Sequence, residues 1–247
     1  IVALGGRVQP IDGVGRDLDR SMESEGEVGP VEIVVDGLGY ADDANALVGE
    51  SMTNPSKYFR NNVASGINLL DMAVEAGVKK FVFSSTCATF GIPDRMPLDE
   101  TLPQHAINPY GESKLMFETV LRWYEKIHGL SFVALRYFNA AGASEKFGED
   151  HRIETHLIPN VLKVALGQKD HVEIYGTDYE TPDGTCIRDY IHILDLARGH
   201  LVALNHLRSH HPGVRAWNLG TGKGSTVYDM IKAFSHAVGR DLRIELV

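Results

Sequence analysis

A tyrosine and a lysine form the pair of side chains in this sequence best suited to proton transfer. Tyr110 precedes Lys114 by four positions, and in a helix this spacing puts both side chains on one face, about one turn apart. A phenol titrates at about pH 10, but a lysine cation beside it stabilises the phenolate and lowers the pKa of the phenol. The pair can therefore serve as a general base at neutral pH. The same spacing also occurs on ordinary solvated helix faces.

Hydroxyl residues end the strand that is expected before this helix. The run at residues 79–85 predicts a buried strand, and Ser84, Ser85 and Thr86 stand at its carboxyl end. Ligands of open α/β sheets bind at that edge, so a hydroxyl there can donate a hydrogen bond to a substrate oxygen or to the phenolate. The alternative is that these hydroxyls only satisfy backbone groups at the end of the strand.

The elements that hold these residues alternate between strands and helices. We expect a helix over residues 54–77, a strand over 79–85, a long loop over 86–109, a helix over 110–128 and a strand over 131–138. Two strands joined by a helix predict a parallel sheet. Shorter elements are expected at residues 156–166, 172–175, 194–207, 216–219 and 226–238. The first 30 residues show neither the apolar periodicity of a helix nor the alternation of a strand. The first strand that the pattern predicts is at residues 31–35.

Composition and charge exclude several classes of protein. Of the 247 residues, 43% are hydrophobic and 23% charged, which argues against a disordered, fibrous or membrane chain. Lysine and arginine total 24 against 33 aspartate and glutamate residues, a formal net charge of −9, so binding to nucleic acid or anionic lipid is not expected. Cys87 and Cys186 have no spacing that indicates a disulfide framework or a metal site. We expect a cytoplasmic protein without a metal.

The motifs together resemble the extended short-chain dehydrogenase/reductase superfamily and, within it, the UDP-glucose 4-epimerases. Five motifs in the family's order carry the resemblance: FSST at 83–86, NPYGESK at 108–114, RYFNAAG at 136–142, DGTCIRDYIH at 183–192 and NLGTG at 218–222. Residues 48–51 and 58–62 are also similar, so the likeness runs from about Ala46 to the C-terminus.

The resemblance implies an α/β fold with a Rossmann-like doubly wound parallel sheet and a smaller C-terminal substrate-binding α/β subdomain. It implies an atypical N-terminal segment at residues 1–45, a partial NAD-binding Rossmann domain at 46–145 and a nucleotide-sugar-binding subdomain at 146–247, with the chain crossing between the two lobes. Helices 56–76 and 110–128 resemble the pair through which such epimerases form dimers, so a homodimer is expected. Their apolar stripes could equally face the chain's own sheet.

The resemblance also assigns catalytic and cofactor roles. Tyr110 would take the proton from the sugar 4-hydroxyl while a hydride passes from C4 to NAD, Lys114 would lower the pKa of Tyr110 and hold the nicotinamide ribose, and Thr86 would hydrogen-bond the same oxygen. The 4-keto sugar then turns over and receives the hydride on its other face, which inverts C4. The residues implied to bind the cofactor are Asn61, Ser84, Ser85, Tyr110, Lys114 and Tyr137.

A mechanism of this kind needs a loosely held hexose and a firmly held nucleotide diphosphate, so the binding energy should fall on UDP. The residues implied to bind the UDP-sugar are Thr86, Asn139, His156, Leu157, Ile174, Tyr175 and Arg188. Asn139 matches an asparagine near the diphosphate, and the guanidinium of Arg188 suits a phosphate. Taken singly, Asn139 is equally a turn residue, Leu157 a core residue and Arg188 the partner of Asp189 or Asp183.

The family's dinucleotide-binding turn, G-x-x-G-x-x-G between a strand and a helix, is not found. The candidates at residues 13–15 and 26–29 lack the later glycines, and the one at 37–39 is followed by Asp42 and Asp43, which would oppose a pyrophosphate. We therefore expect the first βαβ unit to be missing or degenerate and the chain to be truncated at both ends.

Two other functions compete with epimerisation. The related 4,6-dehydratases and decarboxylases need an acid just after the strand-end hydroxyl, whereas Cys87 and Ala88 follow Thr86, so dehydration is disfavoured. The second is a truncated or non-catalytic relative that binds a UDP-sugar or a partner without turnover. The NAD retained after desalting would separate this second function from epimerisation.

Overall fold

The structure is a computed structural model that describes residues 32–35, 47–145, 148, 154–209 and 216–247. The chain divides into two compact units, one formed by residues 1–136 and 198–218 and the other by 137–197 and 219–247. The glycine candidates at 13–15, 26–29 and 37–39, together with Asp42 and Asp43, lie outside the described residues. The functional domains expected at 46–145 and 146–247 stay a prediction.

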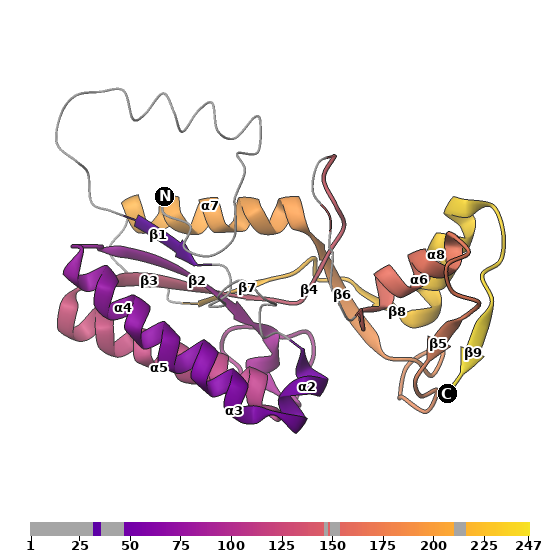
Figure 1. The fold of residues 1–247 in the computed structure, drawn as a ribbon, viewed down its shortest axis with the longest axis horizontal. Coiled ribbons are helices and arrows are strands. Elements are labelled where there is room, and N and C mark those ends of the chain that lie inside the picture. The colour runs from indigo at the N-terminus through magenta and orange to yellow at the C-terminus, as the bar shows by residue number, and fades with distance from the viewer. Residues whose placement is uncertain (1–31, 36–46, 146–147, 149–153, 210–215) are drawn as a thin grey trace. The chain divides into compact units, whose positions relative to one another are not determined.

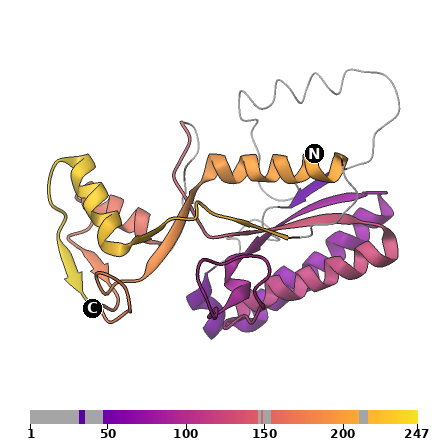
Figure 2. The ribbon, with the colours of Figure 1, turned by 180° about the vertical axis from the view of Figure 1, so that it is seen from behind.

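The first unit is built on a four-stranded sheet with helices on both faces (Figure 1). The strands follow the order β1 (Glu32–Val35), β2 (Lys80–Thr86), β3 (Ser131–Tyr137) and β7 (Ala216–Leu219), and β1 pairs with β2 in parallel. Helices α4 (Ser65–Glu75) and α5 (Pro109–His128) cover one face and α7 (Ile193–Ser209) the other, which the view from behind also shows (Figure 2). This is the doubly wound parallel sheet that was expected.

Strand β2 is buried on both sides because helices cover both faces of the sheet. Its side chains alternate between the faces, and Phe83 packs on Phe117 of α5 with ring centroids 4.8 Å apart. The core on this side of the sheet consists of Leu70, Ala73, Val78, Phe81, Phe83, Phe117, Leu121, Leu130, Phe132 and Ala134. The apolar core thus fixes α5 on the strand whose end carries the hydroxyls.

The ends of α5 follow from three residues. The Asn108 side chain accepts a hydrogen bond from the backbone N–H of Gly111 at 2.8 Å, Pro109 is the first helical residue, and Gly129 ends the helix with a φ of 68°. The helix expected at 110–128 is thereby confirmed. The expected loop before it begins with a 3₁₀-helix, Cys87–Phe90, so that prediction holds only from Gly91 onward.

The helix expected over residues 54–77 is present from Pro55 to Glu75, but part of it is a π-helix. The segment consists of α3 (Pro55–Tyr58), a π-helix at Phe59–Ala64 and α4, and the short helix α2 (Val48–Thr53) precedes it. A π-helix adds a residue per turn, and here the buried Asn62 lies in it and donates a hydrogen bond from Nδ2 to Ser113 Oγ at 2.9 Å. This contact depends on a residue far away in the chain, so the apolar periodicity does not reveal it.

The second unit contains two small sheets and two helices. Strands β4 (Asn139–Ala141), β6 (Ile187–His192) and β8 (Gly224–Thr226) form one sheet, with β4 and β6 parallel and β6 and β8 antiparallel. The other elements are β5 (Val172–Ile174), β9 (Ile244–Leu246), α6 (Leu157–Ala165) and α8 (Val227–Val238). Their core consists of Val161, Val164, Val172, Ile174, Ile231 and Leu242.

Strand β6 was not expected, because Arg188 and Asp189 interrupt any apolar alternation. The strand forms through backbone pairing on both of its edges, with β4 and with β8.

Within the described part of the chain, no helix combines the length and the apolar character needed to cross a bilayer.

Candidate active site

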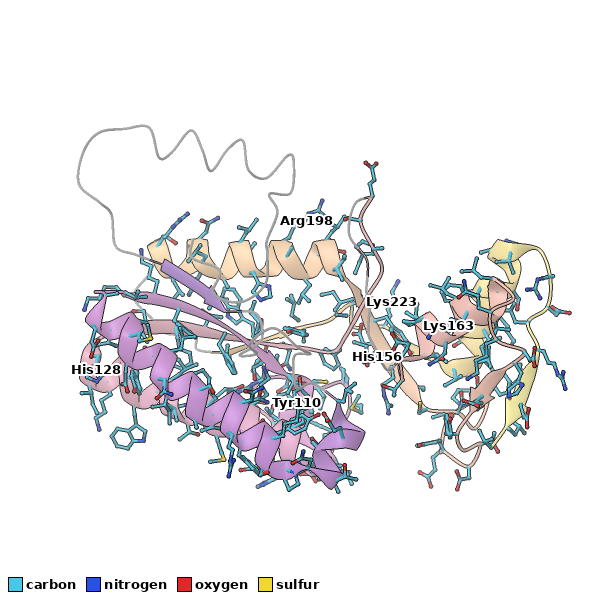
Figure 3. The ribbon with its side chains drawn as sticks, viewed as in Figure 1. Tyr110, His128, His156, Lys163, Arg198 and Lys223 are labelled. Carbon is cyan, nitrogen blue, oxygen red and sulfur yellow. The ribbon has the colours of Figure 1, made fainter. Side chains whose placement is uncertain are left out.

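The lysine expected beside the catalytic tyrosine is buried against the end of β2. The side chain of Lys114 is on α5, its residue is 7% exposed, and its Nζ donates a hydrogen bond to the backbone carbonyl of Ser84 at 3.0 Å. The same Nζ lies 5.1 Å from the ring centroid of Phe83. Tyr110 lies on the first turn of α5, at the end of the helix opposite to His128 (Figure 3). The ammonium is therefore fixed one helical turn from the phenol.

Thr86 is the last residue of β2 and is 6% exposed. Its Oγ1 accepts a hydrogen bond from the backbone N–H of Ala88 at 3.1 Å, and its carbonyl accepts one from Thr89 Oγ1 at 3.0 Å. These two bonds hold the hydroxyl oxygen in place while it keeps its hydrogen for donation, because a hydroxyl has one donor and two acceptor positions.

Ala88 links the hydroxyl to the tyrosine. A Cβ placed on Gly111 would lie 2.6 Å from the carbonyl oxygen of Ala88, a distance that only a glycine can tolerate. The start of α5 therefore approaches the 3₁₀-helix that follows Thr86 to within backbone contact. Since Tyr110 is the neighbour of Gly111, the structure brings Tyr110 and Thr86 to the same carboxyl end of β2.

The serines expected to bind a cofactor point to opposite faces of the sheet. Ser84 Oγ contacts His200 Nε2 of α7 at 3.0 Å, and Ser85 Oγ donates to Glu118 Oε1 of α5 at 2.6 Å. Both hydroxyls thus have partners inside the first unit, and a cofactor would reach them through a remaining hydroxyl lone pair or the backbone. Asn61 lies partly exposed in the π-helix.

The second unit brings Asn139 and the motif around Arg188 together. Asn139 Nδ2 donates to the backbone carbonyl of Asp189 at 3.2 Å. Among the described residues Arg188 forms no ion pair, and its Nη1 donates to the carbonyl of Ile187 at 2.8 Å. The alternative pairing of Arg188 with Asp183 or Asp189 is therefore wrong, and the guanidinium stays on an exposed strand segment.

Asp189 instead holds the glycine-containing turn after β7. It accepts hydrogen bonds from the backbone N–H of Thr221 at 3.0 and 2.9 Å, and from that of Gly222 at 2.8 Å. A Cβ on Gly220 would lie 2.7 Å from Asp189 Oδ2. The sequence motif NLGTG is thus the partner of the motif that contains Arg188.

The remaining residues of the second unit that are expected to bind the nucleotide differ in their contacts and their burial. His156 precedes α6 and its Nδ1 contacts Glu154 Oε1 at 2.8 Å. Leu157 packs against the apolar cluster of this unit, and Ile174 is 2% exposed within it. Tyr175, in contrast, is 71% exposed. The core interpretation of Leu157 agrees with this packing, and the binding roles of all four stay predictions.

Comparison with known proteins shows that the segment carrying the candidate residues Thr86, Tyr110 and Lys114 matches one family. The family model described as the NAD dependent epimerase/dehydratase family matches residues 41–220. The chain belongs to this family. The match includes Thr86, Tyr110 and Lys114.

Relatives within the epimerase/dehydratase family confirm the resemblance and the fold. The UDP-glucose 4-epimerase of Streptococcus mutans is 52% identical over 204 residues, which are 82% of this chain and 61% of that protein. The crystal structure of UDP-glucose 4-epimerase from Brucella ovis in complex with NAD is similar with a TM-score of 0.82 at 45% identity, covering 88% of this chain and 65% of that one.

The structure of UDP-glucose 4-epimerase from Bifidobacterium longum in complex with NAD+ and UDP is similar with a TM-score of 0.79 at 40% identity, covering 87% of this chain and 64% of that one. The epimerase/dehydratase chain therefore has a Rossmann-like fold. It spans 61% of the length of the curated relative from Streptococcus mutans.

Sequence reasoning assigned no role to Tyr58, which packs beside Tyr110, the tyrosine expected to act as the base. The rings of Tyr58 and Tyr110 meet edge to face at 75°, with centroids 6.3 Å apart. Tyr58 Oη lies 2.7 Å from the carbonyl oxygen of Leu47 and 2.8 Å from Glu50 Oε2. Burial, and then the hydrogen bond to Glu50, raises the pKa of Tyr58, so it stays neutral. The sequence feature that could have pointed to Tyr58 is its place in the motif at residues 58–62, which resembles the family.

Proposed function

We propose that this protein inverts C4 of a UDP-hexose in an NAD-dependent reaction, interconverting UDP-glucose and UDP-galactose through a transient 4-keto sugar. The observation that carries the proposal is the buried Lys114 ammonium, bonded to the Ser84 carbonyl one turn from Tyr110. A proton acceptor and a fixed cation at the carboxyl end of a parallel strand suit oxidation of a sugar hydroxyl. The similar proteins named UDP-glucose 4-epimerase support the same reaction.

The donor set at the end of β2 fits the nicotinamide half of NAD. Lys114 would hold the ribose hydroxyls, and the other proposed contacts are Asn61, Ser84, Ser85, Tyr110 and Tyr137. When bound there, NAD would supply the hydride acceptor, and then the hydride donor, for C4 of the sugar. No metal is part of the proposal.

The chain's own residues then move and stabilise the proton. Tyr110 accepts the proton of the 4-hydroxyl and returns it after the hexose has turned over. The Lys114 ammonium stabilises the phenolate form by its positive charge, and Thr86 donates its hydroxyl hydrogen to the same sugar oxygen. A positioned base of this kind contributes roughly 10²- to 10⁴-fold to the rate.

The second unit supplies the proposed anchors for UDP. The exposed guanidinium of Arg188 suits the diphosphate, because it presents planar paired donors and has no carboxylate partner among the described residues. Asn139 is tied to the same strand through the Asp189 carbonyl. The remaining proposed contacts are Thr86, His156, Leu157, Ile174 and Tyr175. The UDP named in the Bifidobacterium longum complex supports a uridine nucleotide.

A homodimer in the cytoplasm is also part of the proposal. Four large apolar side chains of α4 and α5 are exposed, namely Met72, Met116, Trp123 and Ile127. Burying such side chains against a second copy removes apolar surface from water. The chain has two cysteines, too few for a disulfide framework, which is in keeping with the proposed reducing compartment. A monomeric mass in light scattering would contradict the dimer.

The direct test is turnover of UDP-glucose by the purified protein with NAD added, with UDP-galactose resolved by chromatography. The expected product is UDP-galactose, with Tyr110→Phe as the inactive control and NAD retained after desalting. A 4-keto-6-deoxy product would show dehydration instead. Retention of a UDP-sugar without NAD and without product would support the non-catalytic alternative.

A further inference from the structure

A buried carboxylate lies one helical turn beyond Lys114 on the same face of α5. Glu118 is 1% exposed, and both of its carboxylate oxygens accept hydrogen bonds from named partners. Its Oε1 accepts hydrogen bonds from Ser85 Oγ at 2.6 Å and from Arg136 Nε at 2.9 Å, and its Oε2 accepts one from Arg136 Nη2 at 2.6 Å. The proton transfer proposed above makes no use of this group.

Arg136 also contacts the loop before α5 and the 3₁₀-helix after β2. It is the penultimate residue of β3 and is 3% exposed. Its Nη2 also donates to Gln104 Oε1 in the loop before α5 at 2.9 Å, and its guanidinium carbon lies 5.3 Å from the ring centroid of Phe90. A second arginine near Glu118 is Arg122, whose Nη2 is 3.6 Å from Oε2 and whose side chain is 44% exposed.

Two adjacent hydrogen bonds of opposite direction therefore join α5 to the end of β2. Lys114 of the helix donates to the carbonyl of Ser84, and Ser85 of the strand donates to Glu118 of the helix. The apolar core holds the helix against the strand, and two directional bonds one turn apart define its rotation and its position along the strand more narrowly than one bond would. Tyr110 belongs to this helix and Thr86 follows Ser85 directly.

The ion pair is an unusual way to build a core. Burying two charges costs free energy that their attraction only partly returns, and apolar side chains of similar size often give equal or greater stability. A fold that needed only stability at this place would be served by residues like Leu121 and Phe117, which fill the neighbouring positions of the helix core. Apolar side chains could match the free energy that the ion pair contributes to folding, but they could not reproduce its directional hydrogen bonds.

We propose that Glu118, held by Arg136 and bonded to Ser85, is a positioning residue that sets the register of α5 on β2 and thereby the geometry of Tyr110, Lys114 and Thr86. The inference deepens the function proposed above and rests on it. Glu118 touches neither sugar nor cofactor in this account, and acts only through the helix and the strand end.

The test compares three variants of the purified protein. Glu118→Gln removes the charge and Ser85→Ala removes only the bond to the strand, leaving the buried ion pair intact. The control is Leu121→Ala on the same helix, which is fully buried in the apolar core and costs roughly 2–5 kcal/mol of stability without touching residues 84–86. For each variant we would measure kcat and KM for UDP-glucose at saturating NAD, the melting temperature, and hydrogen exchange of peptides covering 84–90 and 109–114.

We expect Glu118→Gln and Ser85→Ala to lower kcat about 10- to 100-fold, as misplacement by about 1 Å does, with KM within about twofold and faster exchange in both peptides. Leu121→Ala should melt lower yet keep the parent's kcat. The proposal is overturned where kcat follows the melting temperature in all three variants, or where both site variants keep the parent's kcat. If Glu118→Gln does not fold, Ser85→Ala decides.

Failure of the proposed function is a separate outcome. A parent protein without turnover of UDP-glucose contradicts the epimerase proposal, and the exchange measurement alone then decides whether Glu118 couples the helix to the strand. A loss of turnover in Ser85→Ala that appears at limiting NAD and disappears at saturating NAD would assign the effect to cofactor binding and would contradict the positioning role.

Discussion

The ammonium of Lys114 donates a hydrogen bond to the backbone carbonyl of Ser84, with a nitrogen to oxygen distance of 3.0 Å. Because the acceptor is a backbone carbonyl, the position of the lysine depends on the strand backbone and not on another side chain. The end of β2, the ammonium of Lys114 and the first turn of α5 are therefore held together. The bond also satisfies a buried donor that would otherwise cost free energy.

Lys114→Met should remove the cation and keep most of the side chain's volume. We expect kcat for UDP-glucose to fall at least about 100-fold at neutral pH, since a general base contributes about 10²- to 10⁴-fold. The remaining activity should rise toward alkaline pH, because a phenol without a neighbouring cation ionises less readily. Steady-state kinetics from pH 6 to 9 checks this. Lys126→Met is the matched control, because Lys126 lies over Trp123 on the same helix and should leave kcat unchanged.

Gly111→Ala should disturb the approach of α5 to the 3₁₀-helix. Its Cβ would meet the Ala88 carbonyl oxygen at 2.6 Å, so one backbone segment must move. We expect a lower melting temperature together with a lower kcat, because the displaced segments carry Tyr110 and Thr86. Gly49→Ala, with nothing within 4 Å of the added Cβ, should melt within about a degree of the parent, or slightly higher, because alanine favours helix. Equal melting temperatures for both variants would contradict the close contact.

The placement of Tyr110, Lys114 and Thr86 on α5 and β2 was predictable because its signals are local. Tyr110 and Lys114 fall on one face by helical spacing, and Asn108, Pro109 and Gly129 mark the ends of α5. The hydroxyls of β2 follow from the apolar run before them. Short-range sequence patterns therefore sufficed for the pair and for the strand that holds it.

The contacts that support the site were not predictable, because they join distant segments. Glu118 and Arg136 are separated by a helix end and a strand, and a charged residue on a helix is ordinarily solvated. Asn62 of the π-helix is hydrogen-bonded to the distant Ser113, and strand β6 pairs with neighbours on both edges. None of these leaves a period in the sequence, so only the folded chain reveals them.

Tyr124 predicts a fall in stability at alkaline pH. Its Oη donates a hydrogen bond to Asp71 Oδ1, and burial, followed by this bond, raises the pKa of Tyr124 to about 12. Below pH ~10, the ordinary pKa of a tyrosine, both folded and unfolded chains keep the proton and the contribution is complete. From there up to about pH 12 the unfolded chain loses the proton first, so the free energy of unfolding decreases.

The measurement is the urea midpoint at several pH values between about 9 and 12, a window set by the ordinary tyrosine pKa and the raised one. Tyr124→Phe should show a shallower decrease than the parent across this window, since the titrating phenol is gone. Asp71→Asn should also flatten the curve, because the hydrogen bond to a carboxylate and its charge are removed. Identical slopes in the parent and in Tyr124→Phe would show that Tyr124 does not titrate differently in the two states.

Thr86 offers the sharpest test of direct donation to the sugar oxygen. Thr86→Ser keeps the hydroxyl that accepts the Ala88 N–H and keeps its hydrogen, so kcat should stay within about threefold of the parent, the range expected when no hydrogen bond is lost. Thr86→Val has the same shape without the hydroxyl. It should lose about 10- to 100-fold in kcat, which corresponds to one charge-assisted hydrogen bond of about 1.5–3 kcal/mol.

The valine variant also leaves the Ala88 N–H without its acceptor, so a loss of kcat alone would not separate donation from a displaced turn. Hydrogen exchange of residues 84–90 resolves this, because a displaced turn exchanges faster in the absence of substrate. Full activity in Thr86→Val would exclude direct donation. Lower kcat with exchange equal to that of Thr86→Ser places the lost hydrogen bond in the reaction itself, since the strand end and its turn are then unchanged.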